Sequence, residues 1–371
     1  MSYGVDWECS QDVYDGEKLT MTKDVLKRYQ DFWNREEMNR PVLHITVPQY
    51  LDTMEWESIQ PKSMEEEWED IEARYRVFKY KMDNSLYFGE GFPTERAFFG
   101  SVCLAAMLGS DYRYAPYTVW FGLQEPIIKD WRDFESATIN RNSTLFSLIQ
   151  KIYETFGKRL DGQYRLGMTD LGGNFDILAP LRGTENLLLD LMDQPDELFW
   201  VIEKTDKLFE EAFEFYYQIF LSHGQQGMSS WQGIWCDKRY FPLQCDFAAM
   251  ISPDDFAKFV IPSLKRAAAF LDHSIFHLDG PAMIPHLEHL LALEDLDGIQ
   301  WVPGDGNPPA WDEKWFPLYD KIQTAGKNLV LLDVNHADHI LNLCNNFSSR
   351  GMFISANLED EEDAIKVLGN W

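Results

Sequence analysis

Positive charge is scarce in this sequence. Its 371 residues contain 33 lysines and arginines against 61 aspartates and glutamates, a formal net charge of −28. Such a surface repels phosphate groups, so we expect neither nucleic acid nor an anionic membrane as a partner. Apolar runs such as residues 186–192 are far shorter than the roughly 18 residues of a membrane span. The first residues show no basic, apolar leader pattern, so we expect no secretory signal.

Cysteine is sparse as well, with five residues at positions 9, 103, 236, 245 and 344. An odd and low number argues against a disulfide framework and favours a reducing, cytoplasmic location. No C-x-x-C pair occurs, which excludes the common structural zinc motif. A phosphate-binding glycine loop and a Gly-x-Ser-x-Gly elbow are also missing.

What the sequence does contain is an alternation of strand-like and helical patterns. The eight expected strands lie at 40–48, 117–124, 164–170, 227–236, 274–279, 298–302, 328–334 and 351–357. Expected helices include 20–39, 62–82, 183–193, 195–221, 283–293, 313–325 and 336–347. We therefore predict an α/β fold, a single (β/α)8 TIM-type barrel over 40–371, preceded by an N-terminal helical extension over 1–39. A doubly wound sheet is the competing fold, but no Gly-x-Gly-x-x-Gly follows the first strand.

Active sites of such barrels lie at the carboxyl ends of the strands. The residues at these expected ends include Gln124, Asp170, Trp235, Cys236, His277, Asp279, Trp301 and Asn335. Residues 241–246 are expected to form an irregular loop over the same end, which adds Asp246. Among these residues, we expect substrate contacts from Trp235, Trp301, Asp170, Asn335 and Gln124.

The sharpest local pattern is His277-Leu278-Asp279 followed by Gly280-Pro281. Residues two apart on a strand face the same side, so the imidazole and the carboxylate share one space. The pair suits a divalent metal such as zinc, or a general base held by an acid, and Asp246 is a third catalytic candidate. Cys236 or Cys245 could add a soft ligand. The alternative is structural: a buried neutral histidine, an aspartate that accepts backbone hydrogen bonds, and cysteines that only pack.

Tryptophans crowd the second half of the chain, at positions 231, 235, 301, 311 and 315. They predict a flat apolar pocket wall for an aromatic or tetrapyrrole-like ligand. Ordinary core packing explains any single one of them equally well.

Two segments carry a resemblance to a known family. The run from Leu171-Gly172-Gly173 through Arg182-Gly183-Thr184 to Gln194-Pro195-Asp196, with Ile251-Ser252-Pro253-Asp254, resembles the uroporphyrinogen decarboxylase superfamily. The resemblance covers roughly residues 40–370 and implies a (β/α)8 barrel. It also implies one of two activities, cofactor-free decarboxylation or methyl transfer.

The decarboxylase uses an arginine-rich loop after the first strand to hold a substrate with many carboxylates. Here no arginine occurs between Arg40 and Arg74, so any cations would have to come from elsewhere, such as Arg96, Arg113 or Arg182.

The methyltransferases bind zinc through a His-x-Cys on the fifth strand and a cysteine near the eighth. His277 matches the histidine, Asp279 stands at the cysteine position, and the eighth strand has no cysteine. Either the metal site is rebuilt with harder ligands, or no metal is bound. The residues expected to hold a metal are His277, Asp279 and Cys236.

We therefore expect a methyltransferase-like enzyme that moves a methyl group between a corrinoid protein and a small acceptor, with possible assistance by zinc. One alternative is a cofactor-free decarboxylase of a porphyrinogen or another carboxylate. The other is a non-catalytic protein that binds a small molecule or tetrapyrrole, for which the pocket would lack titratable groups with shifted pKa values. The sequence does not determine the oligomeric state.

Overall fold

The computed structural model describes residues 21–51 and 53–371. Its helices are α1 (Lys23–Trp33), α2 (Met54–Ile59), α3 (Met64–Glu69), α4 (Ile71–Asp83), α5 (Cys103–Met107), α6 (Trp131–Phe134), α7 (Thr144–Lys158), α8 (Asn174–Arg182), α9 (Thr184–Asp193), α10 (Pro195–Ser222), α11 (Pro253–Asp255), α12 (Ile261–Phe270), α13 (Leu287–Leu291), α14 (Phe316–Thr324), α15 (Ala337–Asn346) and α16 (Glu361–Leu368). Four short 3-10 or π segments are η1 (Asp246–Met250), η2 (Phe256–Val260), η3 (Pro281–His286) and η4 (Glu313–Trp315). No helix among the described residues is long and apolar enough to cross a membrane.

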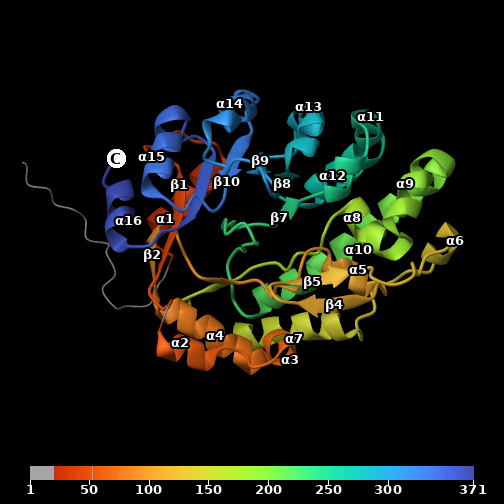
Figure 1. Cartoon of the computed structure of the whole chain (residues 1–371), viewed down its shortest axis with the longest axis horizontal. Helices are drawn as coiled ribbons and strands as arrows, with labels where there is room; N and C mark the ends of the chain where they lie inside the picture. The colour runs from red at the N-terminus through yellow and green to blue at the C-terminus, as the bar shows by residue number, and fades with distance from the viewer. Residues whose placement is uncertain (1–20, 52) are drawn as a thin grey trace, which may run out of the picture.

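The strands are β1 (Val42–Pro48), β2 (Ser85–Gly89), β3 (Thr94–Glu95), β4 (Tyr112–Ala115), β5 (Thr118–Phe121), β6 (Arg165–Leu166), β7 (Tyr240–Leu243), β8 (His273–Asp279), β9 (Gly298–Val302), β10 (Asn328–Leu331) and β11 (Met352–Asn357). Seven of them form one sheet in the order β2-β1-β11-β10-β9-β8-β7, parallel throughout except for the β1–β2 pair. Figure 1 shows α13, α14 and α15 along the outer side of this sheet, and α2, α3, α4 and α7 gathered together away from it.

The fold is therefore mixed α/β with a mainly parallel central sheet, and a TIM-type barrel is compatible with it. β3 pairs with β6 in parallel, and a single parallel bridge joins Gly167 to Ser229. Among the described residues, no strand pair joins these segments to the seven-stranded sheet, so the sheet is not shown to close. The proposed division at residue 39 stays a prediction, and residues 1–20 of the extension lie outside the described residues.

Several strand predictions are confirmed, and two need correction. Residues 274–279 are most of β8, residues 298–302 are β9, and residues 351–357 contain all of β11. Residues 117–124 do not form a barrel strand, because β4 and β5 make a separate antiparallel hairpin that turns at Pro116-Tyr117. Residues 227–236 form no extended strand. The strand that pairs with β8 is instead β7, most of which lies in residues 241–246, the segment expected as a loop. β7 contains Pro242, which a sheet tolerates because β7 is an edge strand.

Local sequence explains most helix boundaries. In α7 the buried residues Leu145, Ile149, Ile152 and Phe156 recur at helical spacing, and the Ser143 side chain accepts a hydrogen bond from the N–H of Phe146 at the start. The single helix expected over 62–82 is two helices. Asp70 separates them, because its carboxylate accepts the N–H groups of Glu72 and Ala73 and so caps α4.

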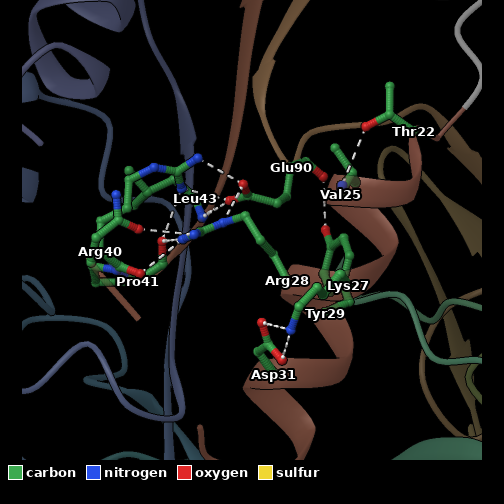
Figure 2. Close-up of polar contacts among 11 residues, drawn as sticks. Thr22, Val25, Lys27, Arg28, Tyr29, Asp31, Arg40, Pro41, Leu43 and Glu90 are labelled. Atoms are coloured by element: carbon green, nitrogen blue, oxygen red, sulfur yellow. Dashed lines mark hydrogen bonds and ion pairs between the residues drawn. The ribbon is translucent and has the colours of Figure 1, made fainter. Parts of the chain in front are cut away.

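A buried ion cluster attaches α1 to the sheet (Figure 2). Glu90, only 1% exposed, accepts two hydrogen bonds of 2.7 Å from the Arg40 guanidinium and one of 2.8 Å from the N–H of Leu43. Arg28 Nε of α1 lies 2.8 Å from Glu90 Oε1, and the Tyr29 hydroxyl donates to the Glu90 carbonyl at 2.8 Å. One carboxylate thus connects the first helix to β1 and to the end of β2.

Candidate functional site

The end of β8 presents His277 and Asp279 on the inner side of the sheet. The alternate residue Phe276 points the other way, since its ring packs against Phe256 of the surrounding η2. Strand geometry therefore places His277 and Asp279 on the face opposite to the helices. The sequence prediction that these two side chains share one space is consistent with this arrangement.

Asp246 joins them from the N-terminus of η1. One possible ligand atom from each of Asp246, His277 and Asp279 lies within 4.8 Å of the others. Among the described residues, no other set of three histidines, cysteines or acids is grouped in this way. We call Asp246, His277 and Asp279 the triad.

Gln300 on β9 determines which nitrogen of His277 is free. His277 Nδ1 lies 2.5 Å from Gln300 Oε1, and this oxygen only accepts, so Nδ1 carries the proton. This hydrogen bond leaves Nε2 as the ring nitrogen that could bind a metal. Gln232 supports Gln300 at 3.5 Å and is itself bonded to the Tyr240 hydroxyl.

Asp176 on α8 holds the backbone that carries Asp246. Its two carboxylate oxygens accept the N–H groups of Asp246 at 2.9 Å and of Phe247 at 2.8 Å. Burial and the nearby Asp246 carboxylate raise the pKa of Asp176 to about 8. Sequence reasoning missed Asp176 because it lies on a helix 70 residues before Asp246.

Asp170 is buried beside the same group. It accepts hydrogen bonds from the Gly172 N–H at 3.1 Å and from Gln244 Nε2 at 3.3 Å. Burial raises the pKa of Asp170 to about 6, although the Gly172 hydrogen bond, His277 and Arg96 oppose this. Asp170 thus lies near the triad, and it is not among the residues that line the neighbouring cavity described below.

A cavity of about 680 Å³ opens beside the triad at the carboxyl ends of β1, β9, β10 and β11. Its lining includes Gln300, the hydrogen-bond partner of His277, and Trp231, whose ring meets the His277 ring edge-on at 5.1 Å. Trp301 and Trp311 add apolar wall, and the expected contact of Trp301 with a substrate stays a prediction. Cavities of this size hold drug-sized ligands. Asp246, His277 and Asp279 are not among the residues that line it, but Gln300 and Trp231, which do line it, both contact His277.

Three residues predicted for this site lie elsewhere. Trp235 and Cys236 lie near the amino end of β8: the Trp235 carbonyl accepts from Trp33 Nε1, and the Trp33 ring stacks on His273, the first residue of β8. The Cys236 thiol is buried and accepts the Lys238 N–H at 3.4 Å. Gln124 is exposed after the β4–β5 hairpin, where its N–H bonds to Asp111. We therefore assign none of the three to the site.

Asn335 lies after β10 and bonds to the end of β11. Its side-chain oxygen accepts the N–H of Asn357 at 2.8 Å, which ties the segment after β10 to the end of β11. Asn357 and Asp333 line the cavity, whereas Asn335 is not among the lining residues. Its contribution is to shape this rim.

His44 of β1 also lines the cavity, and the sequence analysis did not select it. Its Nδ1 lies 3.0 Å from the Gly233 carbonyl, and burial lowers its pKa to about 4. The folded protein therefore keeps His44 neutral at pH values where the unfolded chain protonates it.

This difference predicts how stability depends on pH. The contribution of neutral His44 is fully present above pH 6.5 and declines as the pH falls from 6.5 to about 4, because the unfolded chain then binds more protons. His44→Gln, which can still donate to Gly233, is expected to reduce the loss of stability between pH 6.5 and 4.5 by about 2 kcal/mol. Urea unfolding at several pH values measures this, with His336→Gln as an exposed control. The expectation is wrong if the free energy of unfolding falls equally between pH 6.5 and 4.5 in His44→Gln and in the unaltered protein.

Comparison with known proteins agrees with the fold. No protein-family model matches the chain, and no curated protein matches it. A solved structure of a methyltransferase from Methanosarcina mazei is similar with a TM-score of 0.60 over 93% of this chain and 97% of that one, at 12% identity. At this level of identity the two chains share a fold along almost their whole lengths, and the fold alone is what the comparison establishes.

Proposed function

We propose that this protein is a methyltransferase-like enzyme that moves a methyl group between a corrinoid protein and a small acceptor bound in the cavity. The observation that carries the proposal is the triad: a nitrogen and two carboxylates within 4.8 Å, next to a cavity of about 680 Å³. The similar fold of a methyltransferase supports the choice of reaction but does not decide it.

The triad fits a divalent metal. One imidazole and two carboxylates are ligand types that zinc accepts, and three protein ligands leave a position for a substrate. Because His277 Nδ1 is bonded to Gln300, Nε2 is the His277 atom that would bind the metal. The Asp246 side chain is exposed to solvent. Harder ligands thus replace the thiolates that the resemblance implied.

The remaining residues would place the reactants. When bound, zinc supplies Lewis acidity that lowers the pKa of an acceptor thiol and favours its thiolate near neutral pH. Gln300 orients the His277 ring, and Asp176 holds the backbone of Asp246. Trp231, Trp301 and Trp311 exclude water from the acceptor and hold its apolar part.

The direct test is methyl transfer from methylcobalamin to 2-mercaptoethanol. We expect turnover by the zinc-loaded protein, its loss after chelation, and its return when zinc is restored. Loss of the methylcobalamin absorbance measures the reaction. Turnover that is unchanged by chelation, or no turnover by the zinc-loaded protein, would contradict the proposal.

A cofactor-free decarboxylase of a small carboxylate is the second candidate. Arg96 lines the cavity, and Asp170 nearby has a pKa of about 6, so it could hold or release a proton near neutral pH. No other lysine or arginine lines the cavity, which disfavours a porphyrinogen with many carboxylates. Release of carbon dioxide that survives chelation would favour this candidate. His44 lines the cavity and burial lowers its pKa to about 4, whereas a non-catalytic binding pocket predicts lining groups without shifted pKa values.

Gln300 gives a test of the metal site that does not depend on turnover. Gln300→Leu is expected to weaken zinc binding about 10–100-fold, because the second partner of a metal-bound histidine orients its ring. Competition with a chromophoric chelator measures the affinity. Gln323→Leu, which removes an amide bonded to Ser348 outside the site, is the matched control. Equal affinities for the two variants would show that Gln300 does not orient a ligand.

A further inference from the structure

Arg96 is the one lysine or arginine among the residues that line the cavity. Its Nη1 donates to the Trp231 carbonyl at 3.2 Å, and its guanidinium lies over the Phe98 ring at 4.8 Å. No other hydrogen bond and no ion pair of Arg96 is found within residues 21–51 and 53–371. Most of its donors are therefore unused.

Several other buried or partly buried arginines meet a carboxylate, whereas Arg35 and Arg165 donate to neutral oxygens and have no ion pair among the described residues. The pairs are Arg40 with Glu90, Arg74 with Glu95, Arg182 with Asp190 and Arg266 with Asp206. The acids nearest to Arg96 are already bonded elsewhere. Glu95 pairs with Arg74 at 2.8 Å, and Asp170 accepts from Gly172 and Gln244. Arg35 and Arg165 do not line the cavity, whereas Arg96 does, so among these three arginines only Arg96 can pair with an anion that enters the cavity.

We infer that the cavity binds a substrate carrying one carboxylate on an apolar, ring-bearing body, with the carboxylate paired to Arg96. Guanidinium and carboxylate match in a two-bond fork, and the indoles of Trp301 and Trp311 provide apolar wall for the body. The exposed acids Asp305 and Asp333 also line the cavity. They would repel the anion, and they make a second negative charge unfavourable, so we commit to a monoanion.

Trp231 links this anion position to the triad. Its carbonyl accepts from Arg96, and its ring meets the His277 ring at 5.1 Å. A ligand held by Arg96 thus extends across Trp231 toward His277. This placement of the reacting end rests on the proposed function, whereas the anion position rests on Arg96 alone.

Benzoate, with benzamide as its neutral analogue, is the probe for this site. We expect benzoate to change the tryptophan fluorescence of the protein and to bind at least about tenfold more tightly than benzamide, as hydrogen bonds to charged groups allow. Arg96→Gln is expected to lose at least about tenfold in benzoate affinity and to remove the preference over benzamide. Arg96→Lys keeps the charge but cannot form the two-bond fork, so its benzoate affinity should lie between those of the unaltered protein and Arg96→Gln. Arg113→Gln, an exposed arginine of the β4–β5 hairpin, is the control.

Three results would overturn the inference. They are equal binding of benzoate and benzamide, unchanged benzoate binding by Arg96→Gln, and no benzoate binding up to about 10 mM. Tighter binding of phenyl phosphate than of benzoate would overturn the assignment of a single charge. The titrations use metal-free protein and need no turnover, so a failed zinc or methyl-transfer assay with intact benzoate binding would reject the proposed function and leave this inference standing.

Discussion

Replacing His277 with alanine is expected to weaken zinc binding at least about 100-fold. Loss of an outer partner of a metal ligand already costs about 10–100-fold, and His277 supplies the only nitrogen of the triad. Two carboxylates without a nitrogen ligand are a poor zinc site at this small number of donors. Metal content after dialysis and chelator competition measure the effect.

Two further variants make this test specific. Asp279→Asn keeps the size of the side chain and should also weaken zinc binding, because it removes a charged ligand. His336→Ala, an exposed histidine outside the triad, should leave the zinc affinity unchanged. Equal zinc content in His277→Ala and in the unaltered protein would end the metal hypothesis. Circular dichroism of each variant shows whether the fold is retained.

Replacing Glu90 with glutamine is expected to lower the free energy of unfolding by about 3–5 kcal/mol. The amide removes the charge that pairs with both Arg28 and Arg40, whose side chains are only 20% and 14% exposed. Removing one member of a buried ion cluster leaves uncompensated charges in a poorly solvated position. A loss of this size is a large part of the 5–15 kcal/mol that stabilises a typical domain.

Urea unfolding followed by tryptophan fluorescence measures this loss. Glu211→Gln is the matched control, because its pair with Arg141 is about half exposed on both sides and is expected to be worth less than about 1 kcal/mol. Similar unfolding midpoints for the two variants would mean that the Glu90 cluster adds no more than a surface pair. Since Arg28 belongs to α1, protease sensitivity near α1 should rise in Glu90→Gln.

The sequence predicted the part of the site that lies on one strand. His277 and Asp279 are two residues apart, and alternation along a strand is a local property that needs no knowledge of the fold. The expectation that strand ends gather in an α/β sheet also selected Asp246, although its segment was expected as a loop and contains β7. β8, β9 and β11 were predictable because each is a short, apolar, β-branched or aromatic run between helical patterns.

Other predictions failed where the outcome depended on distant partners. Trp235 and Cys236 end an apparent strand in the sequence, yet neither lines the cavity. The Trp235 carbonyl instead accepts from Trp33 of α1, whose ring stacks on the first residue of β8. Residues 117–124 have the composition of a strand, and nothing local distinguishes a barrel strand from one arm of a hairpin. Arg96 was named only as one possible anion partner, and no spacing in the chain relates it to Trp231, 135 residues later.

The sequence by itself determined the acidic character of the protein, the mixed α/β pattern and the pairing of an imidazole with a carboxylate at one strand end. Those features depend on composition and on periods of two or 3.6 residues, which neighbouring residues alone express. Only the tertiary structure decided that Asp246 completes the triad, that Gln300 sets the proton on His277, and that Arg96 faces a cavity without an ion-pair partner. Parallel strands are joined through long crossovers, so the residues that meet at their ends are far apart in the chain, and their meeting depends on packing over the whole domain.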